Sequence, residues 1–159
     1  MRFATALIAA LLLQGAVKPE PATRETRHLR VALSASADHA APGRPISLYL
    51  DVTPKPTMHV YAPGQPDYVT VSLKLDRDPS FTAAAPKFPP PEKFLFEPLN
   101  EQQLVYMKRF RVTTDVTPAA SARGDVTVKG TLRYQACDEH VCYLPQTVTV
   151  EWTIAVRDK

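Results

Sequence analysis

The sequence predicts an all-β fold, an antiparallel β-sandwich, on three observations. Apolar and polar residues alternate in several separate segments, which is the pattern of strands that bury one face. Proline, glycine and aspartate residues interrupt the alternation at short intervals, as turns do between strands. No window of the chain has the apolar spacing of an amphipathic helix.

The alternation marks the strands in order along the chain. Leu29 and Val31 open the first, and Trp152 lies in the last, where its position predicts a buried side chain. The predicted strands cover residues 29–35, 46–52, 69–75, 110–116, 126–134 and 148–154. Turns are predicted at Ala41–Gly43, Pro54–Pro56, Pro63–Pro66 and Arg123–Asp125. About seven short strands separated in this way are typical of an immunoglobulin-like antiparallel β-sandwich.

The strand rhythm breaks at Pro86–Pro98, where the sequence is PKFPPPEKFLFEP. Proline lacks a backbone N–H, so this segment cannot pair as a central strand of a sheet. It is interpreted as a long loop. Long loops in small domains are often functional.

The first residues have the layout of a secretory signal peptide, over residues 1–16. A cation at Arg2 precedes an apolar run from Ala4 to Leu13, and small residues follow. The run is too short for a membrane-spanning helix, which takes about 20 residues. We therefore expect an exported protein whose mature chain does not insert into the membrane.

The remaining chain is interpreted as one domain. Residues 17–27 are polar and contain proline, so they are predicted to be a flexible leader, and residues 28–159 are predicted to form the domain. The formal net charge is +3, and the basic residues are scattered among acidic ones. This distribution predicts no nucleic-acid partner and no anionic membrane partner.

The only cysteines, Cys137 and Cys142, lie in YQACDEHVCYLP between two predicted strands. Four intervening residues allow the chain to turn back at an exposed position and form a disulfide. Closing so small a ring stabilises a fold by only about 2 kcal/mol on the chain-entropy argument. His140 would lower a nearby thiol pKa, whereas Asp138 and Glu139 would raise it. The residues alone leave a redox pair and an inert structural bond equally open.

Metal binding is a third interpretation of the same segment. Cys137, His140 and Cys142 supply ligands suited to copper(I) or zinc, and Met58 and His59 could join them from another strand. The spacing matches no common structural zinc motif, and an oxidising compartment would remove the thiols. A metal site is therefore the least favoured of the three.

Three segments together resemble a known family. YQACDEHVCYLP, MHVYAPG at Met58–Gly64 and a proline-rich aromatic segment ahead of VYMKRF at Val105–Phe110 are similar to the N-terminal periplasmic domain of the disulfide interchange protein DsbD, in the same order. The resemblance spans nearly the whole mature chain. Its most specific residues are Tyr134, Cys137, Cys142, Tyr143 and Pro145.

The resemblance implies a periplasmic protein with an immunoglobulin-like fold and a redox-active cysteine pair that requires no cofactor. Carried over by position, Cys142 would form the mixed disulfide with an oxidised client, and Cys137 would resolve it. If the pair turns over, the protein would be a relay of the protein-disulfide reductase type.

Supporting residues also follow from the resemblance. His59 and Tyr61 would pack beside the pair, with Tyr134 in the tyrosine-rich approach to it. The proline-rich loop would cap the cysteines through Phe94, Phe96 or Leu99. From the residues alone, both tyrosines are interpreted as core or cross-strand packing residues, His59 is equally compatible with an exposed strand position, and Phe94 and Phe96 could simply hold their loop on the sandwich.

The implied partners are periplasmic thioredoxin-like proteins or disulfide isomerases as clients, and a membrane-embedded thiol reductant. The chain ends at Lys159 without the membrane-spanning and C-terminal parts of a full-length relay. We therefore expect the reductant to act in trans. The alternative is a non-enzymatic immunoglobulin-like binding module with a structural disulfide.

Overall fold

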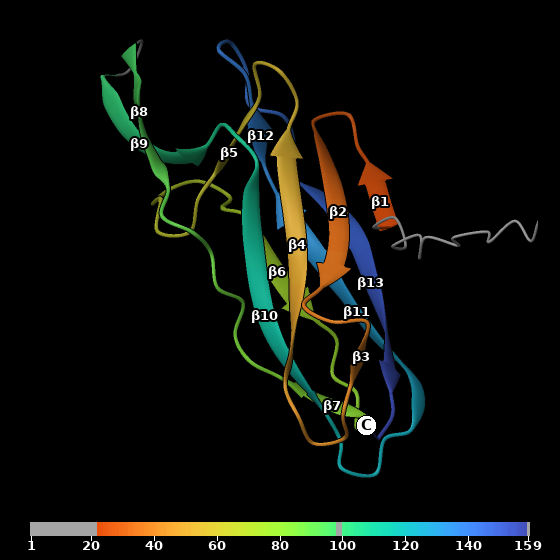
Figure 1. Cartoon of the computed structure of the whole chain (residues 1–159). Coiled ribbons are helices and arrows are strands. Elements are labelled where there is room, and N and C mark those ends of the chain that lie inside the picture. Colours follow the sequence, from red (N-terminus) through yellow and green to blue (C-terminus); the bar gives the residue numbers. More distant parts are fainter. Residues whose placement is uncertain (1–21, 98–99, 159) are drawn as a thin grey trace, which may run out of the picture.

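The computed structural model describes residues 22–97 and 100–158. The predicted signal peptide, the first part of the predicted leader, and Leu99 lie outside these residues. The described chain is all-β, with thirteen strands in three sheets (Figure 1). Within it, no helix is long and apolar enough to cross a membrane.

Two of the sheets form the sandwich. The strands of the first sheet lie in the order β1 (Ala22–Glu25), β2 (Leu29–Ala35), β4 (Ile46–Pro54), β10 (Phe110–Pro118) and β7 (Phe81–Ala83). Those of the second lie in the order β3 (His39–Ala40), β13 (Gln146–Val156), β11 (Gly124–Tyr134) and β6 (Ser72–Leu75). All strand pairs in these sheets are antiparallel except β3 with β13.

The main core lies between these two sheets, as the alternation predicts. Val31, Leu50, Val112, Val128 and Val150 are fully buried, and their polar strand neighbours face outward. Five predicted strands fall within β2, β4, β10, β11 and β13, and Trp152 is buried. The fold class is confirmed. The predicted strand 69–75 forms only from residue 72, because the Val71 N–H binds the Tyr61 carbonyl oxygen instead, at 2.8 Å.

A third sheet lies at the end of the sandwich away from the C terminus (Figure 1). Its strands lie in the order β12 (Ala136–Cys137), β5 (His59–Tyr61), β9 (Glu101–Tyr106) and β8 (Glu92–Phe96). Three of these strands are separated by only short breaks from long strands of the sandwich. In the chain, β5 follows β4, β9 precedes β10, and β12 follows β11. The break between β4 and β5 contains Pro56 and Thr57, and the φ of Thr57 is 69°.

The third sheet has two differently occupied faces. Val60, Tyr106 and Ala136 extend the main core on one face. Their strand neighbours Tyr61, Val105 and Cys137 form a separate buried cluster. Because successive side chains of a strand point to opposite faces, this cluster occupies the other face of the sheet.

Part of the predicted leader, residues 17–27, lies in a strand. Ala22–Glu25 forms β1, an edge strand in register with β2, where Ala22 lies opposite Leu33. Most β1 side chains stay exposed. The strand is therefore held mainly by backbone hydrogen bonds, which leave no apolar alternation in the sequence.

The proline-rich segment is also not a plain loop. Its second half forms β8, which pairs with β9 as a hairpin and lies at the sheet edge, in keeping with the exclusion of a central strand. The prolines at 86 and 89–91 precede β8, and the Tyr106 hydroxyl donates to the Pro89 carbonyl oxygen at 2.6 Å. This contact fixes the approach to the strand.

Candidate functional site

Cys137 and Cys142 are joined by a disulfide bond, and their Cα atoms lie 4.0 Å apart. The expected exposed position holds only for Cys142. Cys137 is 2% exposed, because it belongs to β12 and lies directly opposite His59 of β5. Cys142 is exposed in the loop that follows. The two sulfur-bearing residues are therefore unequally accessible.

Asp138 closes the turn between the cysteines. One carboxylate oxygen accepts the backbone N–H groups of His140 and Val141, both at 2.8 Å. The other accepts the Tyr143 hydroxyl at 2.8 Å. The two backbone hydrogen bonds are the main reason that the pKa of Asp138 falls to about 2.

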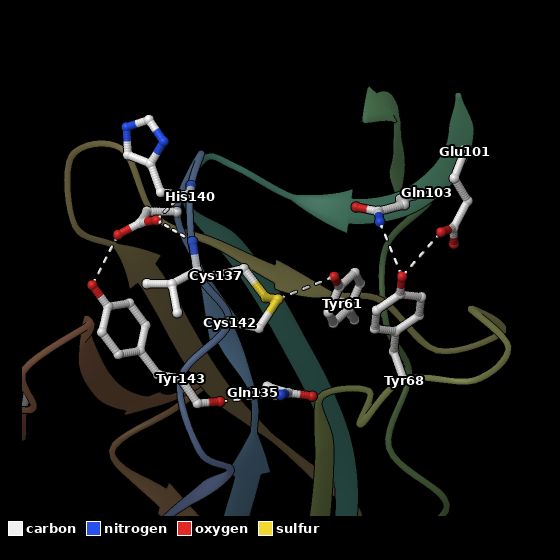
Figure 2. The surroundings of a disulfide bond; sticks show 11 residues. Tyr61, Tyr68, Glu101, Gln103, Gln135, Cys137, His140, Cys142 and Tyr143 are labelled. Atoms are coloured by element: carbon white, nitrogen blue, oxygen red, sulfur yellow. Dashed lines mark hydrogen bonds between the residues drawn. A yellow bond between two sulfur atoms is a disulfide. The ribbon is translucent and has the colours of Figure 1, made fainter. Parts of the chain in front are cut away.

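A tyrosine lies against the exposed sulfur. The Tyr61 hydroxyl is 3.5 Å from Cys142 Sγ, and it is the donor because a disulfide sulfur carries no hydrogen (Figure 2). Burial raises the pKa of Tyr61 well above its ordinary value, with Tyr68 and Glu101 adding to the effect. Tyr61 therefore keeps its proton at any physiological pH.

Tyr68 supports Tyr61 from the loop between β5 and β6. Their ring centroids are 4.1 Å apart. The Tyr68 hydroxyl donates to Glu101 at 3.0 Å and accepts the Gln103 amide at 3.4 Å. Glu101 and Gln103 both lie on β9, so this pair of hydrogen bonds connects the loop to the third sheet.

His59 is buried, which excludes the exposed position that the sequence left open. It is 6% exposed, and its Nε2 atom has no hydrogen-bond partner. Burial lowers the pKa of His59, and the Asp138 carboxylate partly opposes this effect. Its ring packs on Tyr61 and on Phe94 of β8, with centroid distances of 5.8 and 5.4 Å.

A small cavity of about 180 Å³ opens beside the disulfide. It draws residues from β5, β8, β9, the β5–β6 loop and the cysteine loop. The lining residues are His59, Tyr61, Tyr68, Phe96, Gln103, Cys137, Asp138, His140, Val141 and Cys142. Four residues singled out in the sequence, His59, Tyr61, Phe94 and Phe96, thus gather around the cysteine pair or its immediate neighbours.

Tyr134 is not brought to the site. It is fully buried in the main core, and its hydroxyl lies within hydrogen-bonding distance of Thr26 Oγ1, at 2.9 Å, and of Gln146 Oε1, at 2.8 Å. The strand period explains this position, since an odd spacing of three residues places Tyr134 and Cys137 on opposite faces.

Sequence reasoning missed two residues of the site and the structural role of a third. Tyr68 and Gln103 lie outside any recognisable motif, and only the fold brings them to the cysteines. The turn-closing role of Asp138 had a local signal, because aspartate commonly binds backbone N–H groups two residues ahead. Among the described residues, no three histidine, cysteine or acidic side chains are arranged to hold a metal ion.

Comparison with known proteins gives one family. The family model for the N-terminal region of the thiol:disulfide interchange protein DsbD matches residues 30–154. The comparison with curated proteins gave no match.

Solved structures give similar folds. The N-terminal periplasmic domain of ScsB from Proteus mirabilis is 14% identical with a TM-score of 0.55, over 79% of this chain and 46% of that one. This chain thus spans less than half of the ScsB domain. The reduced N-terminal domain of DsbD from Neisseria meningitidis is 25% identical with a TM-score of 0.47, over 79% and 83%.

Proposed function

This chain belongs to the family of the N-terminal domain of the thiol:disulfide interchange protein DsbD, and on that premise we propose that it relays electrons through the Cys137–Cys142 pair to oxidised partner proteins. The observation that carries the proposal is the unequal exposure of the two cysteines. Cys142 is exposed and Cys137 is buried behind it. That arrangement suits an exchange reaction in which one sulfur meets the client and the other stays inside.

The reaction starts from the reduced pair. The Cys142 thiolate attacks a client disulfide, forming a mixed disulfide and releasing one client sulfur as a thiolate. Cys137 then loses its proton and attacks Cys142 Sγ, which forms the intramolecular disulfide and releases the second client sulfur. The client gains two electrons and the pair loses two. No cofactor takes part in these steps.

The surroundings of Cys142 support its role as the attacking sulfur. The Tyr61 hydroxyl, held by burial in its neutral form, is placed to donate to a thiolate at Cys142. A hydrogen bond to the charged form lowers a thiol pKa. Phe94 and Phe96 of β8 act in this scheme as the cap that limits access to the reduced pair.

The proposed partners follow the family. Clients are periplasmic thioredoxin-like proteins or disulfide isomerases, and a membrane-embedded thiol reductant restores the reduced pair. Residues 1–16 would direct export and residues 28–159 would act as the exchange domain. The ScsB domain that this fold resembles is described as periplasmic.

Trapping of the mixed disulfide tests the proposal. A Cys137→Ser variant keeps the attacking sulfur and should accumulate a covalent complex with an oxidised thioredoxin-like protein, seen as a band that a reductant abolishes. A Cys142→Ser variant should form none. Equal behaviour of the two variants would contradict the assignment, and loss of trapping in both, with a fold that loosens on reduction, would favour a structural bond in a binding module.

A further inference from the structure

We propose that His59 is the general base that removes the proton from the Cys137 thiol when this cysteine resolves the mixed disulfide. This inference rests on the proposed exchange function and adds one residue to it. Cys137 needs such a base because a thiol must become a thiolate before it attacks sulfur. Its 2% exposure keeps bulk water from serving this purpose readily.

The sheet register brings the two side chains together. His59 and Cys137 lie directly opposite each other in the antiparallel pair of β5 and β12. Directly opposed residues point to the same face, with Cβ atoms about 5 Å apart. Both side chains also line the same cavity beside the disulfide.

The imidazole has an unused proton-binding position. His59 is only 6% exposed, and its Nε2 atom has no hydrogen-bond partner. In the disulfide form, neither sulfur carries a hydrogen to offer it. Reduction creates an S–H group at Cys137, the residue directly opposite His59, so the catalytic cycle itself supplies a donor on this face of the sheet.

The charges around His59 fit a base that is neutral at rest. Burial lowers its pKa, so the ring is uncharged near neutral pH. An uncharged ring has a nitrogen lone pair available to accept a proton. Asp138 and His140 face the cavity from the cysteine loop, and Tyr61 lies beside His59 on β5. Tyr68 and Gln103 complete the polar lining, while Phe96 of β8 contributes no charge. Asp138 is the group placed to stabilise the imidazolium once it forms.

The proposed step balances. The Cys137 proton moves to His59, and the resulting thiolate attacks Cys142 Sγ. The intramolecular disulfide forms as the client sulfur leaves with the electron pair of the broken bond. The imidazolium then returns its proton to the client thiolate or to water.

Two-phase reaction of the reduced protein with an equimolar aromatic disulfide tests the step. Attack by Cys142 releases one coloured thiolate, and resolution by Cys137 releases the second, so each step has its own rate constant. His59→Gln should leave the first phase unchanged and slow the second by at least about tenfold near neutral pH. The second phase should also lose the inflection that His59 gives to its pH profile.

His39→Gln is the matched control, because His39 lies on β3 and does not line the cavity beside the disulfide. It should keep both phases. His59→Phe provides a second variant, and an unchanged first phase reports an intact site in each. If the wild type shows a normal second phase and both His59 variants keep it, the role of His59 is overturned while the exchange function stands. The absence of any second phase in the wild type would instead overturn the exchange function and the inference with it.

Discussion

Asp138 is the residue that organises the space between the two cysteines. Its carboxylate accepts three hydrogen bonds, two from the backbone of the turn and one from Tyr143. These contacts hold the chain in the conformation that brings the sulfur atoms together. A turn that is already formed keeps the reduced thiols close to each other, and thiols held close form their disulfide more readily.

Removal of this carboxylate should therefore make the disulfide easier to reduce. We expect Asp138→Ala to shift the reduction potential to less negative values by roughly 10 to 30 mV, where about 30 mV is a tenfold change in the equilibrium constant. Equilibration with glutathione buffers measures the shift. Glu139→Ala, in the same turn, should leave the potential unchanged, and equal potentials for both variants and the wild type would refute the role of Asp138.

The pH range in which this contact acts follows from the direction of the Asp138 pKa shift. The pKa of Asp138 lies below its ordinary value of 3.8, at about 2. The contribution of the contact is therefore complete above about pH 4 and is lost as the pH falls through about 2. The difference between Asp138→Ala and the wild type should stay constant across neutral pH.

At the scale of the element, β8 divides its side chains between two surfaces. Phe94 and Phe96 are half-buried toward the cysteine site, whereas Leu95 between them is 52% exposed on the opposite face. Phe94 packs on His59, and Phe96 lines the cavity. A short edge strand has few backbone hydrogen bonds, so it can open locally without unfolding the sandwich.

The two faces of β8 give a matched test of the cap. Phe94→Ala removes an aromatic pair worth about 0.5–1.5 kcal/mol, so the cap should open roughly two- to tenfold more often. The alkylation rate of the reduced Cys137, which is buried, should rise by the same factor. Leu95→Ala changes the same strand on its other face and should leave the rate unaltered. Similar rates for the two variants would show that β8 does not cover the pair.

At the scale of the whole molecule, the sandwich provides the main core and the third sheet carries the cysteine site. The two large sheets bury the main core, and their strands β4, β10 and β11 adjoin those of the third sheet. The third sheet buries one face against the same core and carries the cysteine cluster on the other. The chemistry thus sits on elements anchored in the rigid part of the fold.

Buried histidines should make the whole fold sensitive to acid. His28 and His59 are both buried, and burial is the main reason that their pKa values fall below 6.5. The unfolded chain then binds protons more tightly, so stability is complete above about pH 6.5 and decreases as the pH falls below it. Asp51, paired with Arg109 and Arg111, has a lowered pKa and adds a further loss below pH 3.8.

Thermal unfolding between pH 7 and pH 5 measures this effect. The wild-type melting temperature should fall with pH, and the double variant His28→Gln, His59→Gln should show a smaller slope. His140→Gln, on an exposed position, serves as the control. Slopes are compared because the buried substitutions also change the absolute stability. A slope that the double variant leaves unchanged would contradict the assignment.

The long strands were predictable because burial of one face requires an apolar residue at every second position. β11 and β13 bury every second residue from Val126 and from Val148 to their ends, which produces a plain alternation. β1, β5 and β12 are too short for a period to emerge, and backbone pairing holds β1. β8 was obscured by the prolines just before it.

The site was predictable in its centre and less so in its surroundings. The cysteine spacing and the segment around His59 and Tyr61 indicated the pair and two of its neighbours. The burial of Cys137 depends on pairing between β12 and β5, residues far apart in the chain. Tyr68 reaches the site through a loop, and its ring contact with Tyr61 depends on tertiary structure alone.

The reduction potential of the Cys137–Cys142 pair in the purified mature domain tests the central claim most directly. Equilibration in glutathione or dithiothreitol buffers, followed by thiol trapping, gives its value. We predict a potential of roughly −180 to −270 mV, the range of proteins that exchange disulfides. A value below about −300 mV would identify a structural bond and contradict the proposed relay.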